Sequence, residues 1–293
     1  MQITILAKSP AMPPLNSLRN LLEDKGVKVV GTETLPIPKT LENCRSGLRL
    51  SLRGQATFLD TKEVVASGLD DGVDANLQHA EDRISNIKLA VFDMDSTLIQ
   101  CEVIDELAKQ AGVGDRVIEI TERAMRGELD FNESFTERLG LLGGLDAGVV
   151  HEIAASLPFN DGAQELMQTL RARGVRTVIL SGGFDVFAKR VVSVLQMDDY
   201  VANSLEIVDK KLTGRVIPPI VNADKKRSQL VAIAKSMAID LSQTMAIGDG
   251  ANDLKMLQTA GLGIAFKAKP VVRQQAKYQL THVGLDGALY LMG

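Results

Sequence analysis

Short runs of alternating hydrophobic and polar residues dominate the chain as far as His79. Because side chains of a β-strand point alternately to its two faces, such runs predict half-buried strands, whereas apolar residues three or four positions apart predict a helix. Strands are predicted at Gln2–Ala7, Val27–Thr34, Leu48–Leu52 and Val73–Leu77, and helices at Leu15–Asp24 and Thr61–Gly68. The order βαββαβ is that of the split ferredoxin-like motif. We therefore expect a small domain over residues 1–84, with the polar stretch Ala80–Asn86 as its linker.

From Lys88 onward the pattern changes to uninterrupted apolar runs separated by longer stretches with helical spacing. The apolar runs are Leu89–Phe92, Val175–Leu180, Thr244–Ile247 and Leu262–Phe266, and the clearest helical stretches are Ala163–Arg173 and Lys225–Met237. Alternating strands and helices of this kind predict a doubly wound parallel sheet, an α/β fold, over residues 85–293. Such sheets bind their ligands beyond the carboxyl ends of the strands.

Polar residues follow three of these predicted strands at the point where each strand ends. Asp93 and Asp95 follow the first, Ser181–Gly183 the second, and the third leads into Asp249 within the sequence GDGAND. Carboxylate oxygens are the ligands that Mg²⁺ prefers, and glycines allow a sharp turn that exposes backbone N–H groups to an anion. Lys226, on a helix before the third strand, adds a positive charge. The pattern indicates a site for a phosphate group and a magnesium ion.

Each of these motifs also has an ordinary structural interpretation. Asp-x-Asp is common in turns and helix caps, Gly-Asp-Gly and Ser-Gly-Gly are common in loops, and a lysine in the basic run Lys225–Arg227 is usually solvated. What favours function is the combination, because every motif occurs in the expected order and each follows a predicted strand or lies on a predicted helix.

Composition narrows the class of protein. The chain has 293 residues, of which 45% are hydrophobic, and a formal net charge of −4, so a nucleic-acid partner is not expected. The two cysteines, Cys44 and Cys101, lie far apart and suit a reducing compartment. The first residues lack the pattern of a signal peptide, and no apolar run reaches the roughly 20 residues that cross a bilayer. We expect a cytoplasmic protein without a membrane partner.

Together, DMDST, LSGGF, Lys226 and GDGAND resemble the four motifs of the haloacid dehalogenase superfamily, over residues 87–293. Within it, the chain is most similar to the phosphoserine phosphatase family. Three features carry this narrower resemblance: the position of Glu102 after Asp95, the double glycine of LSGGF, and a helical insert over about residues 103–157. The insert supplies Met125, Phe131 and Arg138.

The resemblance implies a reaction and a set of roles. Asp93 is expected to be the nucleophile that forms an aspartyl-phosphate, and Asp95 the general acid and then the general base. Mg²⁺ is expected on the Asp93 side chain, the Asp95 backbone carbonyl and Asp249, with Asp253 orienting the site from nearby. The implied activity is Mg²⁺-dependent hydrolysis of O-phospho-L-serine to L-serine and phosphate, the last step of serine biosynthesis.

The resemblance also implies which residues contact the substrate. The phosphate group is assigned to the residues that can offer N–H, O–H or ammonium groups, namely Ser181, Gly182, Gly183, Lys226 and Asn252. Glu102, at the mouth of the site, is expected to pair with the substrate ammonium. On the insert, which would close over the site as a cap, Arg138 is expected to pair with the substrate carboxylate, while Met125 and Phe131 line the pocket. By spacing alone, both charges would be exposed helix residues and both apolar residues ordinary cap core.

Three alternatives remain open. The chain could instead be a related phosphatase or phosphotransferase acting on another small phosphate ester, or a sensor that only binds a phosphorylated ligand. The intact pair of Asp93 and Asp95 argues against a mere sensor, which would need no proton-transfer acid. Residues 1–84 resemble the amino-acid-binding regulatory ACT domains in predicted topology. They could equally serve only for packing or dimerisation, and a homodimer is possible.

Overall fold

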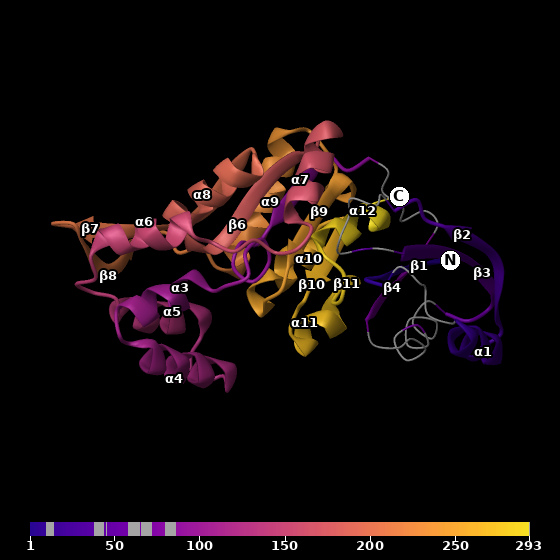
Figure 1. Ribbon diagram of the computed structural model, residues 1–293, viewed down its shortest axis with the longest axis horizontal. Coiled ribbons are helices and arrows are strands. Elements are labelled where there is room, and N and C mark those ends of the chain that lie inside the picture. The colour runs from indigo at the N-terminus through magenta and orange to yellow at the C-terminus, as the bar shows by residue number, and fades with distance from the viewer. Residues whose placement is uncertain are drawn as a thin grey trace.

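The computed structural model of the chain describes residues 1–9, 15–37, 44, 46–57, 65, 72–79 and 86–292. Most of the predicted helix Thr61–Gly68 and of the predicted linker Ala80–Asn86 lies outside these residues. In the described part, no helix is both long and apolar enough to cross a membrane. Figure 1 shows a small sheet at one end of the molecule, a large sheet in the middle and a group of helices at the other end.

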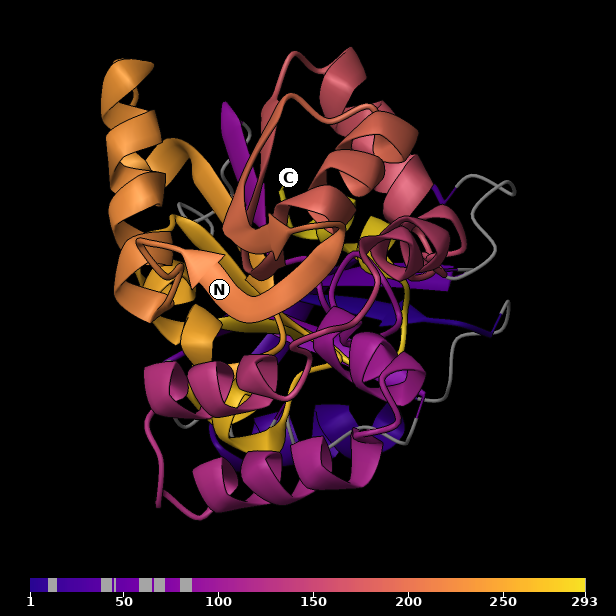
Figure 2. The same ribbon diagram turned by 90° about the vertical axis from the view of Figure 1, so that its left-hand side faces the viewer.

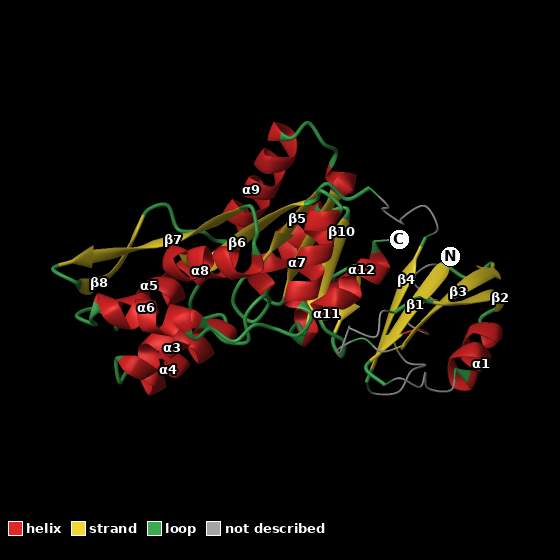
Figure 3. Cartoon of the chain, turned by 45° about the horizontal axis from the view of Figure 1, so that its top comes forward, coloured by secondary structure: helices red, strands yellow, loops and turns green. Residues whose placement is uncertain are grey.

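The small sheet is antiparallel and is built from the N-terminal part of the chain. Its strands are β1 (Gln2–Ala7), β2 (Val27–Thr34), β3 (Ser46–Gly54) and β4 (Val73–Gln78), in the order β2-β3-β1-β4. Helix α1 (Asn16–Asp24) covers one face, where its Leu18 and Leu22 pack in one core with Ile3 and Leu50 (Figure 3). The prediction of a small sheet domain that precedes the α/β domain is confirmed.

The other face of the small sheet is polar but buried, because it contacts the C-terminal segment of the chain. The Asp74 carboxylate accepts hydrogen bonds from the backbone N–H groups of residues 281, 282 and 283 at 2.7, 2.9 and 2.9 Å. Asn76 pairs with both backbone groups of Gln279, each at 2.8 Å, and Arg49 donates to the Tyr290 carbonyl at 3.1 Å. Buried polar groups need such partners, so the two domains fit each other in a defined orientation.

The large sheet has the strand order β11-β10-β9-β5-β6-β7-β8. All neighbours are parallel except β7 and β8, which form an antiparallel hairpin at one edge. The strands are β5 (Leu89–Phe92), β6 (Arg176–Phe184), β7 (Asp199–Val208), β8 (Lys211–Ile217), β9 (Thr244–Gly248), β10 (Leu262–Phe266) and β11 (Tyr278–Leu280). The predicted α/β fold with a parallel sheet is confirmed.

Helices cover both faces of this sheet. They bury the side chains of its central strand β5, which point alternately to the two faces. Leu89 and Val91 of β5 belong to one hydrophobic core, and Ala90 and Phe92 belong to the other. The core that contains Leu89 and Val91 is completed mainly by α9 (Ala223–Ser236), α10 (Leu254–Thr259) and α11 (Pro270–Gln275). The core that contains Ala90 and Phe92 is completed mainly by α7 (Ala163–Ala172), α8 (Asp185–Leu195) and α12 (Ala288–Leu291). Three single-turn 3₁₀ helices lie between these elements, at Leu241–Gln243, Ala251–Asp253 and Leu285–Gly287.

Four further helices form the insert between β5 and α7. They are α3 (Val103–Gln110), α4 (Gly114–Met125), α5 (Phe131–Gly140) and α6 (Ala147–Ala155). Seen from their side of the molecule, the magenta helices α4 and α5 lie side by side (Figure 2). Two chain connections join the insert to the sheet domain, and they pair through an isolated β-bridge between Ile99 and Phe159.

The structure differs from the sequence analysis at the end of β6. A sharp turn was expected at Ser181–Gly183, but β6 continues through these residues to Phe184, and its register with β7 shifts between Leu180 and Phe184. At this point the side-chain amide of Asn203, on β7, donates to the Gly182 carbonyl at 2.7 Å and links the two strands. Gly182 and Gly183 therefore lie in an extended strand, where their lack of a side chain leaves room for neighbouring groups.

Candidate active site

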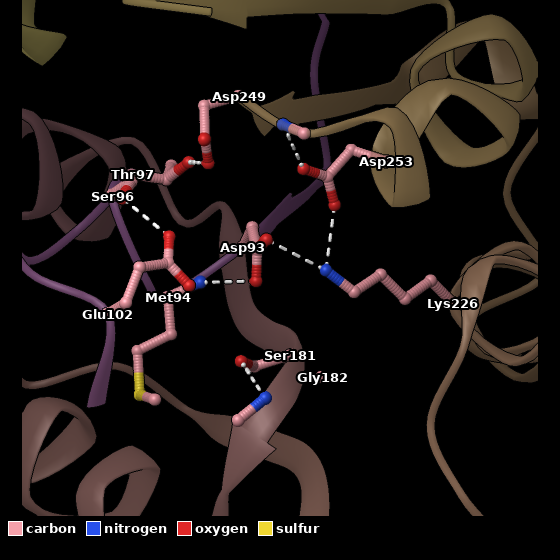
Figure 4. A network of polar contacts seen from close by, with 12 residues as sticks. Asp93, Met94, Ser96, Thr97, Glu102, Ser181, Gly182, Lys226, Asp249 and Asp253 are labelled. Atoms are coloured by element: carbon pink, nitrogen blue, oxygen red, sulfur yellow. Dashed lines mark hydrogen bonds and ion pairs between the residues drawn. The ribbon is translucent and has the colours of Figure 1, made fainter. Parts of the chain in front are cut away.

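Four charged side chains meet at the carboxyl end of the large sheet (Figure 4). Asp93 follows β5, Asp249 follows β9, Asp253 lies one turn further on, and Lys226 comes from α9. The Lys226 ammonium lies 2.9 Å from the Asp93 carboxylate and 2.7 Å from that of Asp253. The elements that the sequence predicts do bring these residues together.

Lys226 is fully buried, with a relative exposure of 0%. Burial by itself lowers the pKa of a lysine, because the charged form loses its water. The adjacent charges of Asp253 and Asp93 outweigh this effect, and the pKa of Lys226 is raised. The site therefore contains a permanent positive charge beside Asp93, where it can neutralise a phosphate oxygen.

Carboxylates outnumber this cation, and the surplus negative charge fits a metal ion. Oxygen atoms of Asp93, Asp249 and Asp253 lie within 4.8 Å of one another. Burial and the charges of Asp93 and Asp253 raise the pKa of Asp249 to about 8, so its negative charge lacks compensation. Both Asp253 oxygens already have donors, Lys226 at 2.7 Å and the Gly250 N–H at 3.0 Å. The Asp93 oxygens have donors as well, the Met94 N–H at 2.7 Å and Lys226 at 2.9 Å, and Asp249 accepts from the Thr97 hydroxyl at 3.0 Å. Hydrogen bonds alone therefore do not separate the three carboxylates as metal ligands, and Asp253, which is held by Lys226 and the Gly250 N–H, is suited to orienting Lys226.

Asp95 lies beside the acidic cluster, where the sheet domain meets the insert. One of its oxygens accepts a hydrogen bond from the Val103 N–H, at the start of the insert, at 3.2 Å. Its other oxygen faces Gly183, where a Cβ atom would lie only 2.6 Å away. Burial of the carboxyl group, together with the charges of Glu102 and Asp93, raises the pKa of Asp95. A carboxyl group that keeps its proton can serve as a general acid.

The residues after Asp95 connect it to other parts of the site. The Ser96 hydroxyl donates to Glu102 at 2.7 Å, and the Thr97 hydroxyl donates to Asp249 at 3.0 Å. Both hydroxyls belong to the motif DMDST, but the sequence analysis assigned no role to either. Their position in that motif is the signal that could have identified them.

Ser181 and Gly182, near the end of β6, lie close to Asp93 (Figure 4). Ser181 is fully buried, and its hydroxyl oxygen accepts a hydrogen bond from the Gly183 N–H at 2.9 Å. A Cβ atom at Gly182 would lie 3.2 Å from the Phe131 ring and 3.9 Å from the Asn252 amide nitrogen. The structure therefore places Phe131 of the insert and Asn252 of the sheet domain next to this glycine.

The insert residues differ in how closely they approach the site. Arg138 is half-buried on α5, where burial lowers its pKa and the surrounding carboxylates of Asp105, Glu102 and Asp95 oppose that shift. Its charge therefore lies within electrostatic reach of these three carboxylates. Met125, in contrast, is 71% exposed at the end of α4, and none of its described contacts joins it to the acidic cluster.

Comparison with known proteins identifies the family. Residues 87–261 match the model of the haloacid dehalogenase-like hydrolases. The phosphoserine phosphatase of Streptococcus thermophilus is 49% identical over 203 residues, which cover 69% of this chain and 94% of that protein. The phosphoserine phosphatase of Streptomyces coelicolor is 47% identical over 79% of this chain, but the match spans only 55% of that longer protein.

Solved structures agree with this result. A haloacid dehalogenase family hydrolase from Salmonella enterica matches 100% of this chain and 99% of its own, with a TM-score of 0.84 and 31% identity. A substrate-bound phosphoserine phosphatase matches 71% of this chain and 99% of its own, with a TM-score of 0.67 and 38% identity. Sequence and fold agree over nearly the whole of the Streptococcus thermophilus protein and of both solved structures, and the chain therefore belongs to the phosphoserine phosphatases, within the haloacid dehalogenase-like hydrolases.

Proposed function

We propose that this site hydrolyses O-phospho-L-serine to L-serine and phosphate through an aspartyl-phosphate on Asp93. The observation that carries the proposal is the buried Lys226, which lies within hydrogen-bond distance of both Asp93 and Asp253. It provides fixed positive charge at the carboxylate that would attack phosphorus. Phosphoryl transfer depends mainly on such positioning and charge neutralisation.

In the first step, an Asp93 oxygen attacks the phosphorus atom and the bond from phosphorus to the serine oxygen breaks. The Asp95 carboxyl group donates its proton to that oxygen, so serine leaves as a neutral alcohol. The raised pKa of Asp95 favours this role because it keeps the carboxyl group protonated before the step.

In the second step, a water molecule attacks the phosphorus atom of the aspartyl-phosphate. Asp95, now a carboxylate, takes a proton from that water, and the bond from phosphorus to the Asp93 oxygen breaks. Phosphate is released, and both aspartates return to their starting protonation states.

The phosphate oxygens would be bound by Lys226, Ser181, Asn252 and the N–H groups of Gly182 and Gly183. We assign the metal ion to the Asp93 side chain, the Asp95 carbonyl and Asp249, and name Mg²⁺ because the donors are all hard oxygens. When bound, the ion would neutralise charge on the phosphate oxygens.

Recognition of serine would come from the insert and from Glu102, just before it. Arg138 would bind the carboxylate of the substrate, because a guanidinium group can form two parallel hydrogen bonds to it. Glu102 would bind the ammonium group, and Phe131 would close the pocket over Gly182. Met125 keeps its predicted role only if the insert moves when substrate binds.

For the N-terminal domain we propose an ACT-like regulatory role and a contribution to a homodimer. Support comes from its described elements, four strands in one antiparallel sheet with α1 on one face, which agree with this part of the predicted motif. Its polar face already contacts the C-terminal segment, so deleting the domain would expose unpaired backbone groups. Regulation is therefore better tested by titrating the full chain with L-serine and separating allosteric from competitive inhibition. A cytoplasmic location stays a prediction.

The substrate assignment is tested by measuring phosphate release from a panel of small phosphate esters with Mg²⁺. Removing one partner of a buried charge pair costs about 2–5 kcal/mol. Arg138→Ala should therefore lower kcat/KM for O-phospho-L-serine by about 30-fold or more, and that for phosphoethanolamine far less. Arg138→Lys should restore only part of the loss. If the unmodified enzyme prefers another ester, or transfers the phosphoryl group to another alcohol, that reaction replaces hydrolysis of O-phospho-L-serine as the activity of this site.

A further inference from the structure

One buried amide group binds the loop that follows Asp95. The side-chain nitrogen of Asn160 donates to the backbone carbonyl oxygens of Ser96, Thr97 and Ile99, at 3.2, 2.9 and 3.1 Å. Asn160 is only 6% exposed. An amide nitrogen carries two hydrogen atoms, so three acceptors use its donor capacity completely. This arrangement fixes the course of the backbone over residues 96–99.

The amide is itself held in one orientation. Lys267 donates from its ammonium group to the Asn160 side-chain oxygen at 3.2 Å, and the Asn160 backbone N–H donates to the Leu98 carbonyl at 2.9 Å. A flipped amide would place its oxygen against three carbonyl oxygens and its nitrogen against a cation. The hydrogen-bond network therefore settles which way the side chain points.

The loop needs such support because its backbone is strained. Ser96 has a φ angle of 55°, in the left-handed region that residues with a side chain rarely adopt. Strained residues persist only when their surroundings hold them, and they cluster at functional sites. From this conformation the Ser96 and Thr97 hydroxyls reach Glu102 and Asp249.

Asn160 also lies where the chain returns from the insert to the sheet domain. The outgoing and returning connections pair through the bridge between Ile99 and Phe159, and the Gln100 N–H donates to the Pro158 carbonyl at 2.9 Å. Asn160 follows this pairing directly. It therefore couples the base of the insert to the loop that carries the proton-transfer group.

We propose that Asn160 is a positioning residue for phosphoryl transfer, which holds residues 96–99 so that Asp95 and Asp249 keep their places. It acts through the loop backbone and does not contact the substrate. The proposal rests on the proposed function of the site. It predicts a loss in the chemical steps rather than in substrate binding.

The test compares Asn160→Ala with a matched control, Asn76→Ala. Asn76 is also a buried asparagine, 4% exposed, that bonds to the backbone, but its partner Gln279 lies at the interface with the N-terminal domain. Displacing a catalytic group by about 1 Å costs roughly 100-fold in rate. Asn160→Ala should lower kcat by about 10–100-fold with KM nearly unchanged, whereas Asn76→Ala should lose similar thermal stability and keep its kcat.

A folded Asn160→Ala variant with kcat close to that of the unmodified enzyme would overturn the proposal, as would a loss that appears only in KM. Should Asn160→Ala not fold, Asn160→Asp serves instead, because it keeps the size of the side chain and an acceptor for Lys267 but has no nitrogen that can donate to the three carbonyl oxygens. This variant should lower kcat by about 10-fold or more, and an unchanged kcat would again overturn the proposal. The comparison uses whichever ester the unmodified enzyme prefers, so its outcome is separate from that of the substrate assignment.

Discussion

Gly183→Ala tests the geometry around Asp95 with a single added carbon atom. At Gly183, a Cβ atom would lie 2.6 Å from one Asp95 oxygen, 2.8 Å from the Met94 methyl carbon and 3.2 Å from the Ser181 hydroxyl oxygen. Real Cβ contacts below 3.0 Å essentially never occur, and ordinary contact begins at 3.4 Å. The Asp95 carboxylate must therefore move by about 0.8 Å, or the strand must move away from it.

The expected cost follows from that displacement. A shift of about 1 Å in a reacting group can lower a rate by roughly 100-fold, which is also the lower end of what general acid–base catalysis contributes. We expect kcat for Gly183→Ala to fall by about 100-fold. The fold should remain intact, because the carboxylate and the methionine methyl group are the ends of side chains that can move.

Steady-state phosphate release from O-phospho-L-serine, with circular dichroism to check the fold, measures this effect. Gly182→Ala is the comparison, since a Cβ atom there would meet the Phe131 ring at 3.2 Å and the Val221 carbonyl at 3.5 Å, and not Asp95. Its effect should fall mainly on KM, through the insert. A kcat for Gly183→Ala within about threefold of the unmodified value would refute the placement of Asp95 as the proton-transfer group.

Three further changes have defined outcomes. Asp95→Asn should lower kcat by about 10²–10⁴-fold while Mg²⁺ still binds, as calorimetry can measure. Asp74→Ala should lower the urea midpoint and leave kcat unchanged, because three backbone N–H groups lose their acceptor far from the site. Asp286 is 1% exposed, and burial raises its pKa to about 6. A carboxyl group whose pKa is raised in the folded state contributes its full stabilisation below its unfolded pKa of about 4, and this contribution is lost as the pH rises through about 6. Urea unfolding curves measured across this pH range should therefore show on the order of 3 kcal/mol less pH dependence for Asp286→Asn than for the unmodified protein.

The sequence identified the parts of the fold that depend on local patterns. The predicted strand Leu262–Phe266 matches β10, and Thr244–Ile247 matches β9 to within one residue, because buried parallel strands are unbroken apolar runs. The β7 and β8 hairpin was not predicted. Its residues mix buried and exposed positions without a clean alternation, so the pattern gave no signal.

Contacts between distant segments could not be predicted in the same way. Arg49 alternates with leucines and would be expected to face solvent, yet it is 7% exposed because it bonds to the Tyr290 carbonyl. The acidic cluster was predictable, since parallel strands end at one edge of a sheet and bring their following residues together. The supporting residues Asn160 and Asn203 were not, because an asparagine that bonds to a backbone carbonyl carries no sequence pattern of its own.

The covalent role of Asp93 is the central claim, and rapid quenching of the enzyme with O-phospho-L-serine tests it most directly. Peptide mass spectrometry of the quenched protein should find one phosphoryl group on Asp93 during turnover. Asp93→Asn should show neither this adduct nor phosphate release, because an amide is too weak a nucleophile to attack phosphorus. Turnover by Asp93→Asn at the rate of the unmodified enzyme, or a phosphoryl group on a different residue, would contradict the account.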